Sequence, residues 1–574
     1  MQTLALSTFK SIAASFASRY RRILVLLLAA VCLALLLHGG TFSALAAESS
    51  GGVPVYGGTL RLANRGDPPS NFDPMFTSSI ALHHVAGTLF GPGNLVMPCR
   101  ENMYMVCPYL ANSWRHNADY TEWAFSIRPD VYWHDGTPFT AEDAKFWLEL
   151  AYFGVTVNGK TRAPAYFKGS LGEITEIEAD RGQLIVRFAQ PTVRFPEMLL
   201  DPRIKIAHPA HLMKPRIEAG DVNVSPLDVG LVGVGPFKFV SYEPGTRVVV
   251  ERFDRYFEKD SLGRRLPYLD RIEFYITPDP VAMDLAIRTG RLDGGARGEG
   301  HYLTKDRMAL YERDLGDKIN FVEMGGGMFR LAFNLLKPGP WQDVRVRRAI
   351  ALWLDSEEAI VGALGGQGYY LARDWPGARY APRSFNLWPQ FNPRRRELDR
   401  AEALRLMEEA GYANGFEMGY LCRALNIERC EFLQQQLAGL KIDLKLHIVD
   451  EAEWNRARFT LEYDTQSGSN FSGTVPEATE RVYGRFSENP DAYARHEDTN
   501  IDRLYFLLRQ AIASDQRAAI WREIERYILQ EQVYVIPIAA SVQVVPYWNY
   551  VKGIVVPPED GHAHTDFATV WLDK

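Results

Sequence analysis

The chain has 574 residues and a formal net charge of −6, with 64 basic and 70 acidic residues. Because the charge is negative and Lys and Arg form no cluster that could follow a phosphate backbone, the sequence excludes nucleic acid as an expected partner. No internal repeat or low-complexity tract is present. The length exceeds what one hydrophobic core usually spans, so we expect two or three domains.

The first 47 residues have the pattern of a secretory signal peptide. Basic residues from Lys10 to Arg22 precede an uncharged apolar run at 23–37, and Ala44-Leu45-Ala46 has the spacing of a cleavage site. That run is shorter than the roughly 20 residues of a membrane-spanning helix. We therefore expect cleavage and export to the periplasm. An uncleaved anchor is the alternative, and Arg21-Arg22 leaves twin-arginine export open.

Cleavage would make the mature chain more acidic. The first 47 residues carry four Lys or Arg and no acid, so 64 basic residues become 60 against 70 acidic ones, a net charge of −10.

Residues 110–150 predict a strand, a turn and a helix. Apolar side chains alternate with small or polar ones over 123–127, as in a strand with one buried face. His134-Asp135-Gly136 favours a turn. Thr140 is placed to cap the following helix, and Asp143 lies three residues on, as in a capping box. Pro129-Asp130 breaks this strand, and the alternation resumes at Val131 and Trp133 until the turn.

Further along, the pattern is that of a mixed α/β chain. Residues 416–450 predict a strand, a helix and a second strand, which implies a parallel pair. In a helix at 399–410, Asp399 is expected to cap the first turn and Gly411 to follow the last one in the left-handed conformation. Further helices are expected at 345–354, 500–512 and 515–530, and strands at 184–186, 248–250 and 272–274.

Several short motifs follow one another in a fixed order. They are Leu110-Ala111, Ser113-Trp114, residues 133–143, Gly233-Val234-Gly235-Pro236-Phe237, Tyr242-Glu243-Pro244-Gly245, residues 267–272, Phe333-Asn334, residues 343–349, residues 409–412 and Gly415-Phe416. In this order they resemble the family 5 extracellular solute-binding proteins, which are the dipeptide, oligopeptide and nickel binders of bacterial ABC importers. The resemblance covers almost the whole mature chain.

The resemblance implies an α/β fold with two lobes around a cleft. This is the type II, cluster C-like periplasmic-binding-protein fold, in which the chain crosses between the lobes twice and an extra domain is inserted beside the first lobe. On this pattern we expect lobe I at 48–82, 230–327 and 531–574, the extra domain at 83–229, and lobe II at 328–530.

Four cysteines remain after the expected cleavage, in two pairs of equal spacing. Cys99 is followed by Cys107, and Cys422 by Cys430. In an exported protein we expect two local disulfides, although four cysteines allow three pairings. A metal site is the alternative, but neither pair has the two-to-four-residue spacing of zinc ligands.

The sequence contains no catalytic constellation. There is no G-x-S-x-G elbow, no H-E-x-x-H and no phosphate loop. The carboxylate pair Glu142-Asp143 lies at a helix start, where the helix dipole favours acids. We therefore expect no enzyme and no cofactor, and a secreted hydrolase is the alternative from another class.

Histidine pairs are the candidates for a metal, because nickel transport is one branch of the family that the chain resembles. His83 and His84 are adjacent and would point in different directions on a helix, whereas His562 and His564 could share one face of a strand. These two lie near the C-terminal end, beside a loop of Pro, acid and Gly, so we expect no bound metal.

The resemblance places ligand contacts on loops at the rims of the cleft. One rim follows Asp73-Pro74 and contains Phe76, Thr77 and Ser79, with His83 nearby. Tyr369 and Trp375, in a Gly-rich loop, are the aromatic candidates for stacking on a ligand.

The second rim follows a helix at 451–460. In peptide-binding members the counterpart of Tyr463-Asp464 leads into Trp-x-x-Asp, whose Asp pairs with the peptide's amino group. Here the matching stretch contains Asn470, Phe471 and Ser472 and ends in Gly473, so the acid is missing and only a rearranged loop would bring Glu477 into its place. An unpaired ammonium group in a desolvated cleft costs several kcal/mol. This departure disfavours a free-amine peptide.

The expected function is therefore that of a monomeric periplasmic receptor for an ABC transporter. It would capture a peptide or peptide-like solute between the lobes by hinge closure and deliver it to the permease in the inner membrane. The hydroxyls and amides of the 470–473 loop favour, as alternatives, an oligosaccharide, an opine-like conjugate or a modified peptide. A module that presents its ligand to a membrane sensor would have the same sequence features.

Overall fold

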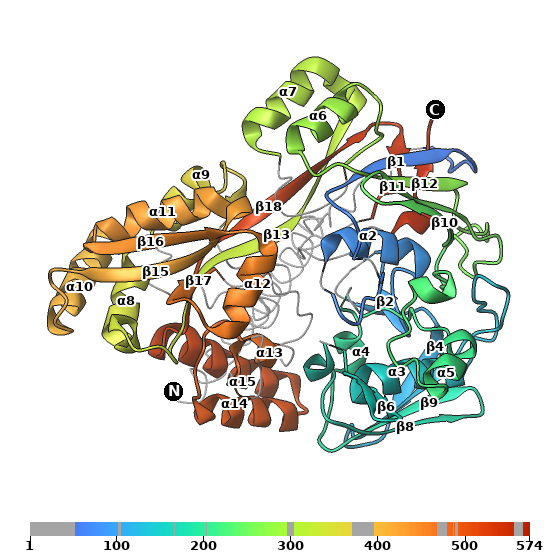
Figure 1. The fold of residues 1–574 in the computed structure, drawn as a ribbon, viewed down its shortest axis with the longest axis horizontal. Helices are drawn as coiled ribbons and strands as arrows, with labels where there is room; N and C mark the ends of the chain where they lie inside the picture. The colour runs from blue at the N-terminus through green and yellow to red at the C-terminus, as the bar shows by residue number, and fades with distance from the viewer. Residues whose placement is uncertain are drawn as a thin grey trace, which may run out of the picture. The chain divides into compact units, whose positions relative to one another are not determined.

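A computed structural model of the chain describes most of the residues after the expected signal peptide (Figure 1). The described residues are 52–69, 71–77, 79–101, 105–165, 167–201, 204–295, 303–369, 395–467, 479–485, 487, 492–555 and 566–574. The expected signal peptide lies outside them. No helix within these ranges has the length and apolar character needed to cross a membrane.

One four-stranded sheet is assembled from segments that lie far apart in the sequence. In sheet order its strands are β1 (Thr59–Asn64), β12 (Arg271–Ile276), β11 (Arg247–Arg252) and β10 (Phe237–Glu243), and the helix α2 (Ile80–Leu89) belongs to the same core. β1 is parallel to β12, and the other pairs are antiparallel. The core joins Leu82 and Val85 of α2 to Val248 and Phe274 of the sheet, so α2 is fixed by burial of its apolar face.

A second four-stranded sheet is wholly antiparallel. In sheet order its strands are β4 (Ala111–His116), β5 (Glu122–Ile127), β9 (Gln183–Phe188) and β8 (Ile174–Asp180); the same core contains α3 (Ala141–Phe153), α4 (Phe195–Met198) and α5 (Ala210–Glu218). The expected strand and helix are therefore present as β5 and α3. The Asp143 carboxylate accepts hydrogen bonds from the main-chain N–H and the hydroxyl of Thr140, at 2.9 and 2.8 Å, which secures the start of α3. Between β5 and the turn, the alternation at 131–133 gives only an isolated bridge between Tyr132 and Pro138.

The third and largest sheet contains the expected parallel pair. Its six strands, in sheet order, are β14 (Gly368–Tyr369), β18 (Val535–Trp548), β13 (Ile319–Phe333), β17 (Thr465–Gln466), β15 (Phe416–Arg423) and β16 (Ile442–Val449). β15 is parallel to β16, with the helix α11 (Ile427–Ala438) between them in the chain, as the sequence predicts. β13 and β18 form a long antiparallel ladder, which Figure 1 shows as two strands running side by side.

Most of the remaining elements are helices. They are α6 (Pro280–Arg288), α7 (Lys305–Leu315), α8 (Val344–Trp353), α9 (Ser356–Gly362), α10 (Arg396–Glu409), α12 (Glu451–Thr460), α13 (Glu480–Tyr483), α14 (Thr499–Gln510) and α15 (Ser514–Arg526), and three two-stranded ladders join β2 (Val96–Pro98) to β3 (Val106–Pro108), β6 (Val155–Val157) to β7 (Lys160–Arg162), and β19 (Val551–Lys552) to β20 (Trp571–Leu572). α8, α10, α14 and α15 each start within three residues of the predicted position. The domain boundaries given above stay a prediction.

The expected role of Asp399 is wrong. α10 begins at Arg396 rather than at Asp399, so Asp399 lies inside the helix, where it is buried and forms an ion pair with Arg395 at 3.4 Å. The Arg396 guanidinium, at the first residue of α10, lies 2.5 Å from the Asp355 carboxylate. Gly411 follows the helix with φ of 86°, in the left-handed conformation that was predicted.

Two of the recognised motifs form one packed unit. The main-chain N–H of Gly233 donates to His134 Nδ1 at 3.1 Å, His134 N–H donates to the Gly233 carbonyl at 2.8 Å, and His134 Nε2 lies 3.1 Å from the Gly235 carbonyl oxygen. Gly235 in turn donates its N–H to the Leu89 carbonyl at the end of α2, at 2.9 Å. The turn at His134 and the segment before β10 are therefore held together by direct hydrogen bonds.

Both predicted disulfides are present. Cys99 is bonded to Cys107, and Cys422 to Cys430, each across a separation of 8 residues. The first bridge links β3 to the residue that follows β2, and the second links the end of β15 to α11. The metal-site alternative for these cysteines is thereby set aside.

We expect replacement of Cys422 and Cys430 by alanine to lower the free energy of unfolding by about 2 to 3 kcal/mol, because the unfolded chain regains the entropy that a short closed loop removes. Urea unfolding of the mature protein, followed by circular dichroism, measures this change. The same pair of substitutions at Cys99 and Cys107, which close a loop of equal length, is the matched comparison. An unchanged urea midpoint in both double variants would contradict the expectation.

Candidate functional site

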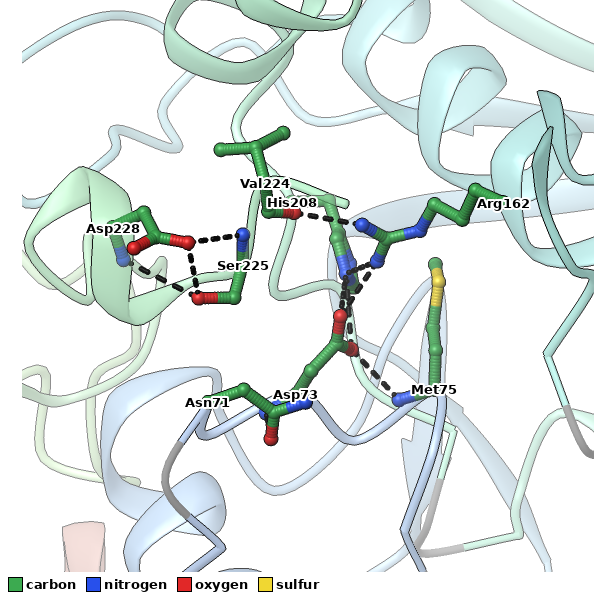
Figure 2. Close-up of polar contacts among 8 residues, drawn as sticks. All are labelled: Asn71, Asp73, Met75, Arg162, His208, Val224, Ser225 and Asp228. Carbon is green, nitrogen blue, oxygen red and sulfur yellow. Dashed lines mark hydrogen bonds and ion pairs between the residues drawn. The ribbon is translucent and has the colours of Figure 1, made fainter. Parts of the chain in front are cut away.

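The loop that begins at Asp73 is held by a buried ionic cluster (Figure 2). The Asp73 carboxylate accepts hydrogen bonds from Arg162 Nη2 at 2.6 Å and from the Met75 main-chain N–H at 2.9 Å, and His208 Nε2 lies 3.1 Å from Oδ1. The Asp73 main-chain N–H donates to Asn71 Oδ1 at 3.2 Å. Asp73 is 1% exposed. Both the side chain and the backbone of Asp73 are therefore fixed.

This cluster keeps Asp73 ionised although it is buried. Burial alone would raise the pKa of Asp73, but the charge and the hydrogen bond of His208, together with the charge of Arg162, lower the pKa below its usual value. A buried carboxylate is tolerated where charges and hydrogen bonds compensate it in this way. The anchor of the loop thus stays intact at neutral pH.

Three of the four residues predicted for the first rim lie at least partly at the surface. The Phe76 ring packs over the Arg162 guanidinium, 4.9 Å from its centroid to Cζ, and its side chain is 42% exposed. Thr77 Oγ1 accepts a hydrogen bond from the Ser79 N–H at 3.0 Å, and Ser79 is the residue that precedes α2. His83 lies one turn into α2 and is 2% exposed. Their contact with a ligand stays a prediction.

A second group of candidate side chains lies where β15 and β17 end. These strands are parallel, so their carboxyl ends meet at the same edge of the sheet. The guanidinium of Arg423, the last residue of β15, lies over the Trp454 ring at 4.6 Å, and that of Arg458 lies over the same ring at 5.0 Å. Trp454 and Arg458 belong to α12, and Arg423 is 6% exposed. The edge therefore gathers two cations around one indole.

The start of the second predicted rim is anchored beside this edge. The Tyr463 hydroxyl accepts hydrogen bonds from Arg495 Nε and Gln466 Nε2, both at 2.8 Å. The Asp464 carboxylate accepts a hydrogen bond from the Gly419 N–H at 2.7 Å and forms an ion pair with Lys337, whose Nζ lies 2.6 Å away. Of the two residues that resemble the family's Tyr-Asp pair, Asp464 is thus held to β15 and to the segment after β13, and Tyr463 to Arg495 and to Gln466 of β17.

Among the remaining predicted contacts, one lies in a described strand. Tyr369 is described in its backbone only, where it pairs with Ala540 of β18. Outside the described residues lie Trp375, Asn470, Phe471, Ser472 and Glu477, together with His562 and His564.

Sequence reasoning missed Arg423, Trp454 and Arg458. A signal for Arg423 was available, because it ends the first strand of the predicted βαβ unit, and ligands of open α/β sheets bind at the carboxyl ends of strands. No comparable signal marks Trp454, whose partner Arg423 is distant in the sequence.

The described side chains are suited to holding a ligand. Arginine offers charged donors, and the hydroxyls of Thr77 and Ser79 and the ring of Phe76 offer polar and stacking contacts. Across the described ranges, no three His, Cys, Asp or Glu side chains are grouped so that they could bind a metal ion.

Comparison with known proteins identifies the family. The sequence model of the bacterial extracellular solute-binding proteins, family 5, middle region, matches residues 106–492. A probable ABC transporter-binding protein of Deinococcus radiodurans is 24% identical over 340 residues, which are 55% of this chain and 54% of that protein. A glutathione-binding protein of Pectobacterium atrosepticum is 25% identical over 348 residues, 60% of this chain and 61% of its own length. The chain thus matches little more than half the length of these relatives.

Solved structures show the same fold. The periplasmic binding protein AgaA, in complex with agropinic acid, from A. tumefaciens R10 has a TM-score of 0.72 and 23% identity, covering 90% of this chain and 99% of its own. The periplasmic binding protein DppA of Helicobacter pylori, in complex with the peptide STSA, has a TM-score of 0.73 and 21% identity, with 91% and 99% covered. These likenesses confirm the predicted mixed α/β periplasmic-binding-protein fold. Since the family's sequence model spans more than half of the chain, this protein belongs to the bacterial extracellular solute-binding proteins of family 5.

Proposed function

We propose that this protein is the periplasmic substrate-binding component of an ABC transporter. It captures a peptide or peptide-like solute between two lobes by hinge closure and delivers the solute to a permease in the inner membrane. The match of the family's sequence model to residues 106–492 carries this proposal. It includes cleavage of the first 47 residues, a monomeric mature chain and the domain division that the sequence predicts.

The ligand carries an acidic group in this proposal. Support comes from the edge of β15 and β17, where Arg423 and Arg458 lie over Trp454 with their guanidinium groups 4.6 and 5.0 Å from its ring. Guanidinium groups favour carboxylates because they can donate two parallel hydrogen bonds to them. Peptides and opines both carry carboxylates, and proteins of this fold have been solved with the peptide STSA and with agropinic acid.

An opine-like or N-blocked ligand is the second candidate. The specific observation is Gly473, which stands where peptide-binding members carry the acid that pairs with a free amino group. A ligand without a free ammonium avoids that unpaired charge. An oligosaccharide would use the same loop through hydroxyls alone.

Ligand released from the native protein tests the proposal. The mature protein is purified from the periplasm of its own host and denatured, and the released small molecules are identified by mass spectrometry. We expect a stoichiometric acidic solute, either a peptide derivative or an opine-like conjugate. Recovery of free-amine dipeptides would overturn the inference from Gly473. If the same preparation hydrolysed a panel of peptides and glycosides, the proposal that the protein is a receptor and not an enzyme would be contradicted.

Affinity measurements on Arg423 test the acidic group. The probes are Met-Leu, Ser-Thr-Ser-Ala, agropinic acid and mannopinic acid, titrated into refolded ligand-free protein by calorimetry. We expect Arg423→Gln to weaken any bound probe by at least about 2 kcal/mol, because one charged partner of a buried pair is lost. Arg405→Gln is the matched control, because within the described ranges Arg405 pairs with the surface residues Glu402 and Glu409 of its own helix. Equal affinities for both variants would remove Arg423 from the site.

A further inference from the structure

Figure 2 shows the buried ionic cluster of Asp73, Arg162 and His208. The exposed Phe76 ring lies against this cluster, through its contact with Arg162. It packs on the Arg162 guanidinium, which is itself only 3% exposed. Arg162 Nη1 donates to the Val224 main-chain carbonyl at 2.7 Å, and Nη2 donates to Asp73 at 2.6 Å. Because both terminal nitrogens of the guanidinium are hydrogen-bonded, the plane of the guanidinium has one orientation. The Phe76 ring packs on this plane, which therefore sets the position of the ring.

These contacts join segments that are remote in the sequence. Asp73 and Phe76 belong to the same loop, whereas Arg162 is 89 residues away from Asp73 and ends β7, the second strand of a short hairpin with β6. His208 Nε2 lies 3.2 Å from Arg162 Nη2 and adds a further segment to the cluster. The hairpin and the loop therefore share one buried ion pair, and the exposed ring lies against it.

We propose that Arg162 is a positioning residue for the ligand, acting through Phe76. This inference rests on the proposed function, in which Phe76 contacts the solute at the rim of the cleft. Arginine suits the role because its planar fork bonds Asp73 and Val224 while its face carries the ring. A lysine ammonium at this point could keep the charge near Asp73, but it has no plane on which the ring can stack. Arg162, which positions the Phe76 ring at the rim, thus belongs to the β6–β7 hairpin and not to the rim loop.

Fluorine-19 resonance of the ring reports its position directly. Phe76 is replaced by 4-trifluoromethylphenylalanine in the full mature chain without ligand, which gives one signal. We expect Arg162→Lys to move this signal toward its position in the urea-unfolded chain and to narrow it, because the ring loses its support. Arg187→Lys is the matched control, because Arg187 pairs with the surface carboxylates Glu122, Glu176 and Glu178 of another sheet region. Circular dichroism confirms that each variant is folded.

A second variant keeps the inference testable if Arg162→Lys does not fold. Asp73→Asn keeps the size of the side chain but removes the negative partner of Arg162, and it is expected to move the same signal in the same direction. An unchanged fluorine signal in every folded variant of Arg162 or Asp73 would overturn the inference, whether or not a ligand binds.

Titration with Met-Leu, Ser-Thr-Ser-Ala, agropinic acid and mannopinic acid links the ring to binding. For any probe that the parent protein binds, we expect Arg162→Lys to raise Kd about tenfold, because the displaced Phe76 ring no longer packs on the ligand. Arg187→Lys is expected to leave Kd unchanged. A displaced ring with an unchanged Kd would refute the role of Arg162. A parent protein that binds no probe and releases no native ligand contradicts the proposed function instead, while the fluorine signal still decides whether Arg162 holds the ring.

Discussion

Gly233→Ala and Gly235→Ala are each expected to destabilise the protein by at least about 3 kcal/mol, because a side chain at either position meets fixed backbone. A Cβ atom at Gly233 would overlap the Leu89 carbonyl oxygen, and one at Gly235 would overlap the Thr88 carbonyl oxygen and lie 2.7 Å from the Gly91 nitrogen. Thr88 and Leu89 form the end of α2 and Gly91 follows it, so these atoms cannot yield without moving the end of the helix. Neither glycine has a positive φ, so the cost is steric and not conformational.

Urea unfolding of the mature protein, followed by circular dichroism, measures this loss. Gly169→Ala is the matched control, since a Cβ atom there meets no heavy atom within 4 Å and the residue has no positive φ. We expect that control to stay within about 0.5 kcal/mol of the parent protein, as for a surface substitution. Similar midpoints for Gly235→Ala and Gly169→Ala would show that α2 can shift away from the motif.

Acid is expected to destabilise the protein through His134. Burial lowers the pKa of His134 to about 4, and the nearby charge of Lys238 adds to this, while the hydrogen bond to Gly235 and the charge of Asp135 act against it. The folded protein therefore keeps the imidazole neutral, while the unfolded chain takes up a proton below pH of about 6.5. The contribution of His134 is complete above that pH and is lost as the pH falls toward about 4.

The size of this effect follows from the shift. At about 1.4 kcal/mol for each pKa unit, the full shift corresponds to about 3 kcal/mol, and partial exposure of the residue reduces this to about 2 kcal/mol. Unfolding free energies of the parent protein and of His134→Gln, measured between pH 4 and pH 7, isolate this part from the titration of carboxylates. Glutamine keeps a donor and an acceptor for Gly233 and Gly235 but does not titrate. Parallel curves for the two proteins would rule the effect out.

Local patterns predicted the local structure well. The alternation at 123–127 became β5, the parallel pair at 416–450 became β15 and β16, and both cysteine pairs closed as disulfides. Each of these features depends on residues that are close in the chain. The period of the pattern and the spacing of the residues largely decide their local geometry. Asp399 is the exception: α10 begins earlier, at Arg396, whose ion pair with Asp355, the residue before α9, joins positions that no local pattern connects.

The candidate site was less predictable because it depends on contacts between remote residues. Resemblance led to the loop with Phe76, Thr77 and Ser79, but nothing in the sequence joins Asp73 to Arg162 or to His208, which lies 135 residues from Asp73. A charged side chain is tolerated in the interior only where an oppositely charged or hydrogen-bonding partner lies beside it, and the fold, not the local sequence, brings that partner there. Arg423 could have been predicted as a candidate, because ligands of open α/β sheets bind at the carboxyl ends of parallel strands. Its stacking on Trp454 depends on how α12 packs, which no local pattern encodes.

The disulfide between Cys422 and Cys430 has a practical consequence for preparing this protein. It flanks Arg423 and closes the segment that leads from β15 into α11, beside the proposed acidic-group contact. Protein made in a reducing cytoplasm would carry thiols at this point, so its affinity would describe a different molecule from the exported one. Production in an oxidising compartment, with a count of free thiols before each titration, is therefore the condition for comparing ligands.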